Sequence, residues 1–441
     1  MFLYPRAVLN FIKRRKVLKF SDDELRQMQL KKFRELVKFA NQHSPYYAEI
    51  ISRLKIDIAT CRPEDFPVMN KEVLLENFDR IITSSEITLD KIKSFLERSK
   101  DPAELYLNKY VVIHSSGSSG LIGYFVYAPE ELLKGIDTFV GRNDDLSLFN
   151  KIAFVGVLDG HYVGASMISF TKHLFPRYNE CKLFNINLPF EDVIEQMNKF
   201  QPTEVCSCTF NLKKLAEQQM SGKLKIKPKY IISSGESLNH EDKMFIASAF
   251  NVPVKIIYTS SETMNAGIQD GQSNDLYLME DNIYFEIEDG KIFITNLFNY
   301  TLPLIRYEMA DELKIVKKEL NDLSFTKIKN VVGRREHIPH FINDFGQMDF
   351  ISQMFVVEFF VKGLRQFQMR VIDKQKFEFF IVLDKELNAT EKEEIKRNII
   401  SKWRDILQKK QMTKVNFKLV EAEELEINPK TGKFNLIRFE D

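Results

Sequence analysis

Short apolar runs alternate with amphipathic stretches through the middle of the chain. Between Lys151 and Tyr300 the runs KIAFVGVL, EVCSC, YIISSG and VKIIYTS are separated by segments with helical periodicity. Two of these helical segments begin near Glu191 and at Leu212, and a third extends from Asn239 to Phe250. Because strands buried on both faces are continuously apolar, this alternation predicts an α/β protein with a wound, largely parallel sheet and helices on its faces.

Residues 21–60 have a helical pattern instead. Ser21 followed by Glu24 has the spacing of a capping box at the start of a helix. The apolar residues that follow fall mostly on one helical face, although Gln29 and Lys32 interrupt it. This segment is therefore predicted to form a helical cap on a larger body.

The segment from Lys109 to Ala128, KYVVIHSSGSSGLIGYFVYA, places a small polar loop between two apolar runs. Residues 110–113 and 124–127 are β-branched or aromatic, which favours strands. Glycines let several backbone N–H groups point into one concavity, and serine hydroxyls add donors, so the loop suits a phosphate group. No Gly-Lys-Ser/Thr follows, so the loop is not of the Walker A type, and a flexible hairpin turn is the alternative. The loop residues are Ser115, Ser116, Gly117, Ser118, Ser119 and Gly120.

Two other polar turns follow predicted strands, at residues 233–237 and 259–262. The carboxyl ends of parallel strands lie along one edge of a sheet, where ligands bind in wound α/β proteins. We therefore expect both turns and the serine-glycine loop to line a common ligand site.

The sequence pattern changes after Tyr300, where it favours antiparallel strands. A further segment of about 100 residues begins near residue 333. The runs FQMRVID, KFEFFIVLD and VNFKLVE, with a helix from Thr390 to Lys409, predict a small α+β domain. We expect a large domain at residues 1–333 and a small, mobile lid domain at residues 334–441.

Composition excludes several classes of protein. The 441 residues include 63 Lys and Arg against 62 Asp and Glu, so no charge excess favours nucleic acid. The four cysteines, at 61, 181, 206 and 208, lack zinc-finger spacing, which argues for a reducing, cytoplasmic location without structural zinc. Charges interrupt the apolar residues at the N-terminus, so neither a signal peptide nor an integral membrane segment is expected, although a membrane-surface helix is an alternative there.

Six motifs, taken in order, resemble those of the adenylate-forming (ANL) superfamily, which includes acyl-CoA and aryl-CoA ligases. Within it the chain is most similar to the phenylacetate-CoA ligase branch, including the coenzyme F390 synthetase-like proteins, and the similarity covers nearly the whole chain. The motifs are SSGSSG at 115–120, SSGESL at 233–238, YTSSE at 258–262, PLIRYEMAD at 303–311, GRRE at 333–336 and KTGK at 430–433.

The resemblance implies that ATP and a carboxylic acid react to give an acyl-adenylate and pyrophosphate, and the branch favours an aromatic acid. Mg²⁺ would offset the charge on the phosphate oxygens, and the acyl group would pass to CoA or to the thiol of a carrier protein. It assigns Glu262 to the metal, Ser261 to the α-phosphate and Lys433 to transition-state stabilisation. The implied nucleotide-binding residues are Ser115 to Gly120, Gly235, Glu236, Ser237, Tyr258, Asp311 and Arg334.

Two further positions have roles under the same resemblance. Glu336 would be the hinge about which the small domain swings, and His161 could line the acyl pocket. Each position also has a structural alternative: Glu336 as part of a charged turn, His161 as a buried structural histidine, and Lys433 as a solvated surface lysine. Glu262 could instead be a carboxylate favoured by a helix start.

Three functions stay open at this point. The first is an acid–thiol ligase, and the second is an adenylyltransferase that places AMP on a cofactor hydroxyl. The third is a nucleotide-binding protein without catalysis, because the chain departs from the family motifs at Leu121, Thr259, Ala310 and His337. Pyrophosphate exchange distinguishes the third from the first two.

Overall fold

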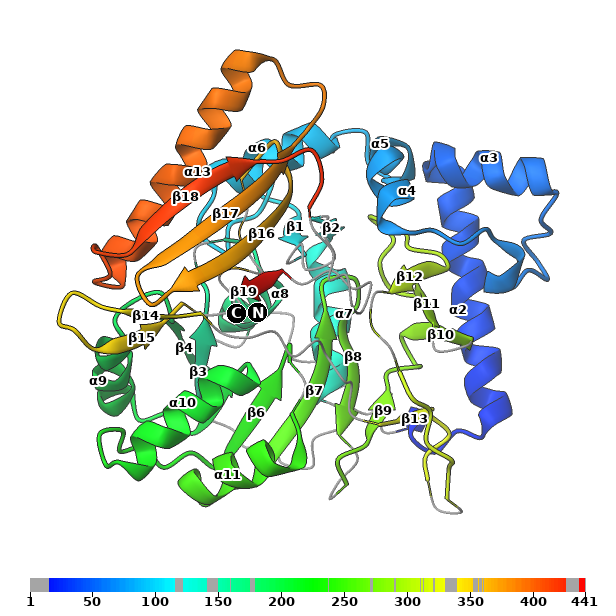
Figure 1. Cartoon of the computed structure of the whole chain (residues 1–441). Coiled ribbons are helices and arrows are strands. Elements are labelled where there is room, and N and C mark those ends of the chain that lie inside the picture. The colour runs from blue at the N-terminus through cyan, green and yellow to red at the C-terminus, as the bar shows by residue number, and fades with distance from the viewer. Residues whose placement is uncertain are drawn as a thin grey trace.

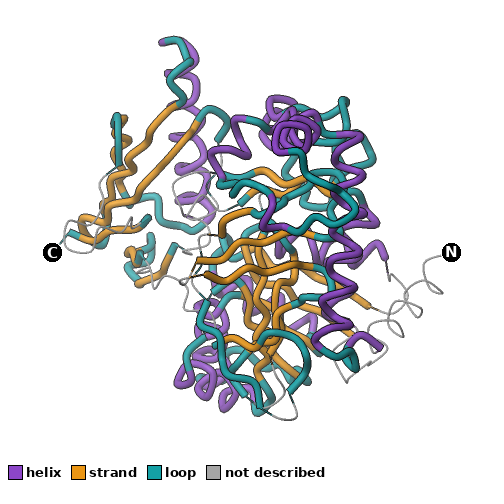
Figure 2. Tube along the Cα trace, turned by 90° about the vertical axis from the view of Figure 1, so that its right-hand side faces the viewer, coloured by secondary structure: helices purple, strands orange, loops and turns teal. Residues whose placement is uncertain are grey.

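The computed structural model of the chain has three regions, which Figure 1 shows in blue, green and orange. Helices from the N-terminal part lie on one side, a large sheet occupies the middle, and a smaller sheet with one long helix lies at the other side. Figure 2 shows that the C-terminal strands and helix stand apart from the larger body. The described residues are 16–115, 122–140, 150–158, 160–174, 179–236, 238–269, 273–288, 291–309, 311, 313–319, 322–329, 339–351, 356, 359, 361–425 and 436–440.

The N-terminal region is helical, as predicted. Its first long helix begins with the predicted capping box: Glu24 N donates to Ser21 Oγ at 3.3 Å, and Ser21 N donates to Glu24 Oε2 at 2.8 Å. The helices are α2 (Asp22–His43), α3 (Pro45–Leu54), the 3-10 turn η1 (Pro63–Asp65), α4 (Lys71–Glu76), α5 (Phe78–Ile81) and α6 (Leu89–Arg98).

The two polar residues that interrupt the apolar face of α2 bind the turn before the strand that begins at Ile283. Gln29 Nε2 donates to the carbonyl of Glu280 at 2.9 Å, and Lys32 Nζ donates to the carbonyl of Asp281 at 2.5 Å. They satisfy buried or half-buried backbone carbonyls, so the interruption marks a contact with the main body.

The central sheet has eight strands in the order β13-β9-β8-β7-β6-β5-β3-β4. The five strands from β7 to β4 are parallel, and Figure 1 shows α10 and α11 in front of them. The strands are β3 (Asn150–Gly156), β4 (Asn179–Asn185), β5 (Glu204–Ser207), β6 (Tyr230–Ser234), β7 (Val254–Ser260), β8 (Met264–Gln269), β9 (Leu276–Leu278) and β13 (Lys327–Ile328). The helices are α8 (Val163–Leu174), α9 (Phe190–Phe200), α10 (Thr209–Met220) and α11 (His240–Phe250).

The alternation of strands and helices ends at β7, earlier than the predicted limit at Tyr300. Only three residues, Ser261 to Thr263, join β7 to β8, and so short a connection returns the chain antiparallel. The strands that follow form a second, antiparallel sheet of β10 (Ile283–Glu288), β11 (Lys291–Asn296) and β12 (Tyr307–Met309).

A separate two-stranded hairpin is formed by β1 (Val111–His114) and β2 (Tyr124–Tyr127), which Figure 1 shows above β7 and β8. All eight of its residues are buried, which explains the continuous apolar runs on both sides of the serine-glycine loop. The hairpin leads into α7 (Pro129–Val140), which packs against β8.

The C-terminal region is a small α+β unit. Its sheet has the order β18-β17-β16-β19 and packs on α13 around Trp403, which is fully buried against Phe377 and Phe379. The elements are the hairpin β14 (His340–Ile342) and β15 (Met348–Phe350), then β16 (Leu364–Asp373), β17 (Lys376–Leu383), α13 (Ala389–Lys409), β18 (Asn416–Glu421) and β19 (Ile437–Phe439). The α/β class with a small α+β unit is thus confirmed, while the predicted boundary at 333 and 334 lies outside the described residues.

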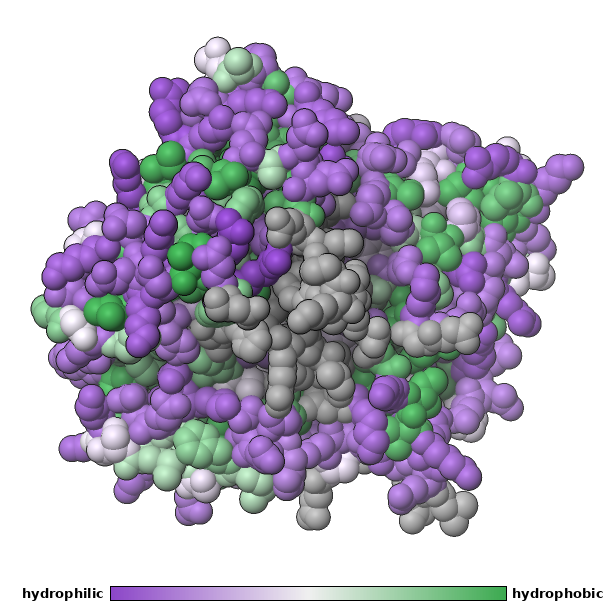
Figure 3. All heavy atoms as spheres, in the orientation of Figure 1, coloured by the Kyte–Doolittle hydropathy of each residue, from purple (hydrophilic) through white to green (hydrophobic). Residues whose placement is uncertain are grey.

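Hydrophilic residues predominate on the face of the molecule that Figure 3 draws. Large hydrophobic side chains that are exposed, such as Met220, Met244 and Phe345, come from separate elements. Single apolar side chains of this kind are ordinary at protein surfaces. Among the helices of the described residues, none combines the length and the apolar character needed to cross a bilayer.

Candidate active site

Two of the three predicted polar turns lie at one edge of the central sheet. β6 and β7 are parallel neighbours, so the turns that follow Ser234 and Ser260 lie at the same edge. The β1–β2 hairpin is joined to the second of these turns by two hydrogen bonds. Ser261 Oγ donates to the carbonyl of His114 at 3.4 Å, and Tyr127 Oη donates to the carbonyl of Ser261 at 2.7 Å.

Ser115 is hydrogen-bonded to Gly123 on the opposite side of the hairpin. Its backbone N–H donates to the carbonyl of Gly123 at 2.7 Å, and its Oγ accepts from Gly123 N at the same distance. The side chain is therefore engaged within the hairpin. Ser116, Gly117, Ser118, Ser119 and Gly120 lie outside the described residues, so their role in holding phosphate stays a prediction.

Glu262 follows β7 and is buried, with 9% of its surface exposed. Burial raises the pKa of its carboxyl group, the positive charge of Lys71 opposes that shift, and the negative charge of Asp311 adds to it. Its backbone is fixed by Asn296 Nδ2, which donates to the Glu262 carbonyl at 2.9 Å. A buried carboxylate of raised pKa at a strand end is a candidate functional group.

Lys71 was missed by the sequence analysis. It is the first residue of α4 and lies nearly two hundred positions before Glu262, so no local pattern links the two. Only the folded chain brings its charge close enough to act on that carboxyl group.

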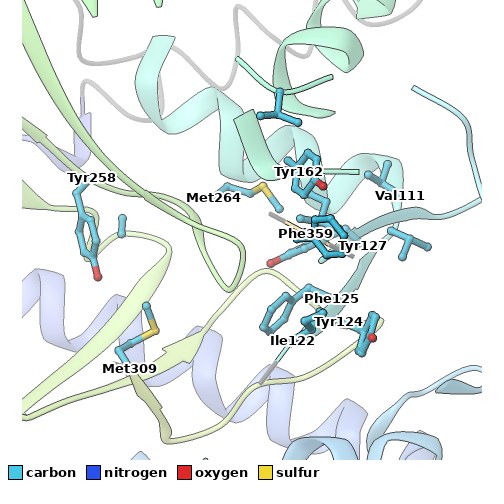
Figure 4. Close-up of a cluster of buried hydrophobic side chains, with 14 of the residues drawn as sticks. Val111, Ile122, Tyr124, Phe125, Tyr127, Tyr162, Tyr258, Met264, Met309 and Phe359 are labelled. Atoms are coloured by element: carbon cyan, nitrogen blue, oxygen red, sulfur yellow. The ribbon is translucent and has the colours of Figure 1, made fainter. Parts of the chain in front are cut away.

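Tyr258 and Asp311 are brought together by the fold. Tyr258 Oη donates to Asp311 Oδ2 at 2.8 Å, which joins the end of β7 to the residue just after β12. Burial, with the charge of Asp311 next, raises the pKa of Tyr258 well above its ordinary value, so the phenol stays a neutral donor. In Figure 4 the Tyr258 ring projects toward Met309, apart from the aromatic cluster of the β1–β2 hairpin around Phe125.

Glu236 binds the start of a neighbouring helix. Its Oε2 accepts from the backbone N–H of Phe210, in the first turn of α10, at 2.9 Å, where a helix dipole favours negative charge. Its other oxygen, Oε1, is buried and has no hydrogen-bond partner among the described residues, and burial raises the pKa of the carboxyl group. Gly235 has φ +79°, a conformation that favours glycine, while Ser237 lies outside the described residues.

His161 is enclosed on the far side of the hairpin and is completely buried. Its Nε2 lies 2.8 Å from Ser99 Oγ, and its ring meets Phe95 edge to face at a centroid distance of 5.0 Å. Burial lowers the pKa of His161 to about 4, so the imidazole is neutral at physiological pH. These contacts give His161 a structural explanation, and its place in an acyl pocket stays a prediction.

Solved structures of an acyl-CoA ligase share this architecture. The chain aligns with 2-hydroxyisobutyryl-CoA ligase in complex with 2-HIB-AMP and CoA in the thioesterification state, at TM-score 0.60 and 15% identity, over 96% of this chain and 91% of that one. An open conformation of the same ligase aligns at TM-score 0.54 and 15% identity, over 94% and 90% of the two chains. The fold is that of 2-hydroxyisobutyryl-CoA ligase.

Sequence comparison gives one relative of this chain. Protein CapK from Staphylococcus aureus is 24% identical over 359 residues, which are 76% of this chain and 73% of that protein. No family model matches the sequence. The assignment of the ligase fold therefore depends on the three-dimensional structure.

In this ligase-fold chain the C-terminal unit rests against the helices that flank the site. Phe350, at the end of β15, meets Phe190 and Phe210 edge to face at centroid distances of 5.7 and 4.8 Å. The ammonium of buried Lys410 lies 3.6 Å from Asp349 Oδ2 and over the Phe350 ring. The β14–β15 hairpin is thus in contact with α9 and with the turn of α10 that Glu236 binds.

Three further predicted site residues lie outside the described residues. Arg334 and Glu336 fall in the segment 330–338, and Lys433 falls in the segment 426–435. Their roles in nucleotide binding, hinge motion and catalysis stay predictions.

Proposed function

We propose that this chain is an enzyme that uses ATP to activate a carboxylic acid as an acyl-adenylate and then transfers the acyl group to a thiol. The observation that carries the proposal is the Tyr258–Asp311 hydrogen bond beside the buried carboxyl group of Glu262, at the carboxyl edge of the sheet. Support also comes from the fold, which is that of a ligase captured with 2-HIB-AMP and CoA.

The nucleotide would lie along this edge. Asp311 has a second carboxylate oxygen, which can accept from a ribose hydroxyl, and the ring of Tyr258 can stack on the adenine while its hydroxyl fixes Asp311. Arg334 would add a fixed guanidinium to the ribose or phosphate. The serine-glycine loop would hold the outer phosphates through backbone N–H groups, and Gly235 would let the backbone approach the base.

The chemistry is an attack by the substrate carboxylate on the α-phosphate, which forms the C–O–P bond and expels pyrophosphate. Two anions must approach each other, so the rate depends on positive charge that is placed for the transition state. We assign that charge to Lys433, with Ser261 as a hydrogen-bond donor near the α-phosphate.

Mg²⁺ fits the donors that the site offers. Glu262 and Asp311 supply carboxylate oxygens, and the described residues contain no cluster of three or more metal ligands. That set suits a hard cation that takes its remaining ligands from ATP oxygens and water. When bound, the ion would neutralise charge on the phosphates, and Glu262 would hold it.

For the second step we propose CoA or a phosphopantetheinyl carrier protein as the acceptor, with Glu336 as the hinge of the small domain. An aromatic acid, as in the phenylacetate-CoA ligase branch, is our first candidate substrate. Transfer of AMP to a cofactor hydroxyl is the competing outcome, and it is distinguished by the product.

The proposal is tested by a screen of carboxylic acids in the ATP–pyrophosphate exchange reaction, with purified full-length protein and Mg²⁺. An aryl or alkyl acid should start exchange, and mass spectrometry after addition of CoA should detect the thioester with AMP. Exchange without any thioester, but with an AMP-modified acceptor, would support the adenylyltransferase. No exchange, together with no ATP binding by calorimetry, would overturn the proposal.

The hydroxyl of Tyr258 is expected to affect ATP more than the acid. Tyr258→Phe removes the bond to Asp311, worth about 1–2 kcal/mol for a hydroxyl bonded to a carboxylate, and should raise KM for ATP about tenfold. Tyr277→Phe is a matched control, since Tyr277 Oη donates to Asp322 Oδ1 at 2.7 Å away from the site. Steady-state kinetics check the prediction, and equal KM values for ATP in the two variants would contradict it.

A further inference from the structure

The N-terminal helical unit is hydrogen-bonded to the segment 300–308 along much of the length of that segment. This segment leads from the antiparallel sheet into β12, and β12 leads to Asp311. Seven hydrogen bonds, spaced along the segment, join it to three residues of the N-terminal unit. Two are donated by Thr83 Oγ1, to the carbonyls of Tyr300 (2.9 Å) and Thr301 (3.1 Å). The other five are Thr83 N to Thr301 O (3.0 Å), Tyr47 Oη to Pro303 O (2.9 Å), Ile305 N to Tyr47 Oη (3.2 Å), Met69 N to Arg306 O (3.0 Å) and Glu308 N to Met69 O (2.8 Å).

Arg306 makes the largest number of contacts that connect this segment to other elements. Its φ is +53°, in the left-handed region that side chains other than glycine seldom adopt. Its backbone N–H donates to Thr295 Oγ1 at 3.0 Å, Nε donates to Glu286 Oε1 at 2.9 Å, and Nη1 donates to the carbonyl of Phe66 at 3.2 Å. The side chain therefore joins β10 to the N-terminal unit, and the backbone N–H binds β11, at a position where the backbone alone would favour glycine.

The ion pair between Arg306 and Glu286 is largely withdrawn from water. The exposed fractions of the two side chains are 19% and 5%. A planar guanidinium directed by two acceptors in different elements fixes orientation as well as distance, which a lysine ammonium does not. The orientation of the backbone at Arg306 is therefore fixed. Because Asp311 is only five residues further along the chain, the position of Asp311 depends on that orientation.

We propose that Arg306 is a positioning residue for the nucleotide site: it sets where Asp311 meets Tyr258, and it makes the N-terminal helical unit a working part of that site. This inference depends on the proposed function, because Asp311 is the group that would receive the ribose of ATP. Arg306 itself does not touch the Tyr258–Asp311 pair and acts through β12.

A purely structural role for Arg306 makes a different prediction. Loss of a structural ion pair lowers the melting temperature and the amount of folded protein, but leaves the kinetic constants of the folded fraction unchanged. Loss of a positioning residue changes KM for ATP and leaves KM for the acid unchanged, since the acid does not bind Asp311 in the proposed site. The ratio of the two KM values therefore separates the two roles.

The experiment uses full-length Arg306→Lys and Arg306→Met proteins, with Arg370→Met as the matched control. Arg370 forms a half-buried ion pair with Glu378 in the C-terminal sheet, far from Asp311 along the chain and in another sheet. We expect KM for ATP to rise about tenfold or more in Arg306→Met and less in Arg306→Lys, with KM for the acid unchanged in both. Arg370→Met should lose stability without a change in either KM.

A double variant covers the case in which Arg306→Met does not fold. Arg306→Met with Glu286→Gln removes the buried carboxylate that the single change leaves without its partner, so it should restore folding but not KM for ATP. Wild-type KM for ATP in a folded Arg306→Met or double variant overturns the proposal, as does an equal rise in KM for both substrates.

Failure of the proposed function is visible separately. If the wild-type protein exchanges no pyrophosphate with any acid, ATP binding by calorimetry replaces kinetics. ATP affinity reduced about tenfold in Arg306→Met, but not in Arg370→Met, then supports the positioning role without the chemistry. Unchanged ATP affinity in Arg306→Met, or no ATP binding by the wild type, overturns it.

Discussion

Lys433→Ala should abolish acid-dependent exchange of pyrophosphate into ATP while the protein stays folded. An ammonium that contacts both the attacking carboxylate and the α-phosphate stabilises the transition state more than the ground state. Removal of one such preorganised charge lowers a rate by about 10²–10³-fold. The exchange assay at saturating ATP and acid measures the loss, and circular dichroism with thermal melting checks the fold.

The same loop provides a control for this prediction. Lys430 lies three residues before Lys433 in the sequence NPKTGK, so Lys430→Ala removes an equal charge from the same basic loop. It should retain exchange close to that of the wild type. Near-normal exchange in Lys433→Ala, or the same loss in both variants, would remove Lys433 from the mechanism.

Glu262→Gln is expected to inactivate the enzyme and also to stabilise the ligand-free protein at neutral pH. Catalysis should fall by about 10²-fold or more, since a carboxylate that holds Mg²⁺ near the phosphates is lost. Burial raises the pKa of Glu262 in the folded state above 4.5, so the ionised form is disfavoured there. Ionised Glu262 therefore destabilises the folded protein at neutral pH, a cost that the neutral amide of the variant does not carry.

The sign of the pH dependence follows from the raised pKa. The contribution of Glu262 to stability is fully present below pH 4.5 and is lost as the pH rises through the folded-state pKa. Melting temperatures of the wild type and Glu262→Gln should therefore converge at acidic pH and separate toward pH 7, with the variant higher. A variant that melts lower than the wild type at pH 7 would contradict this prediction.

Glu131 is a second buried carboxylate whose pKa burial raises, but its backbone hydrogen bonds lead to the opposite expectation for stability. Its two oxygens accept three backbone N–H bonds, from Ala128 at 2.7 Å, Tyr300 at 2.8 Å and Thr301 at 3.0 Å. Glu131→Gln replaces one accepting oxygen by a donor and leaves a buried N–H group unpaired, so it should destabilise the protein. The contrast with Glu262→Gln tests whether Glu262 is held for function rather than for folding.

Elements whose signals are local could be predicted from the sequence. The capping box at Ser21 and the β-rich run Val254–Ser260 both formed as expected, because side-chain caps and β propensity act within a few residues. The limit of the parallel sheet could not be predicted in this way. It depends on the turn Ser261–Thr263, whose shortness sends the chain back antiparallel although the strand β8 that follows is as fully buried as its parallel neighbours.

The same difference applies to the site. Turns at strand ends could be read from polar residues after apolar runs, and the pairing of Tyr258 with Asp311 agrees with the motifs at 258–262 and 303–311. Lys71 and Arg306 act on the site from distant parts of the chain, through burial and through an ion pair between different elements. No local sequence pattern identifies such residues, because their partners are determined by tertiary contacts.

Phe210 is shared by two parts of the molecule, with its ring against Phe350 and its backbone N–H on Glu236. Movement of the β14–β15 hairpin away from Phe210 would remove the apolar contact that covers the first turn of α10, and with it part of the restraint on Glu236. If Glu236 contacts the nucleotide as we propose, nucleotide binding and the position of this hairpin would be thermodynamically linked, and each would shift the other by the same factor.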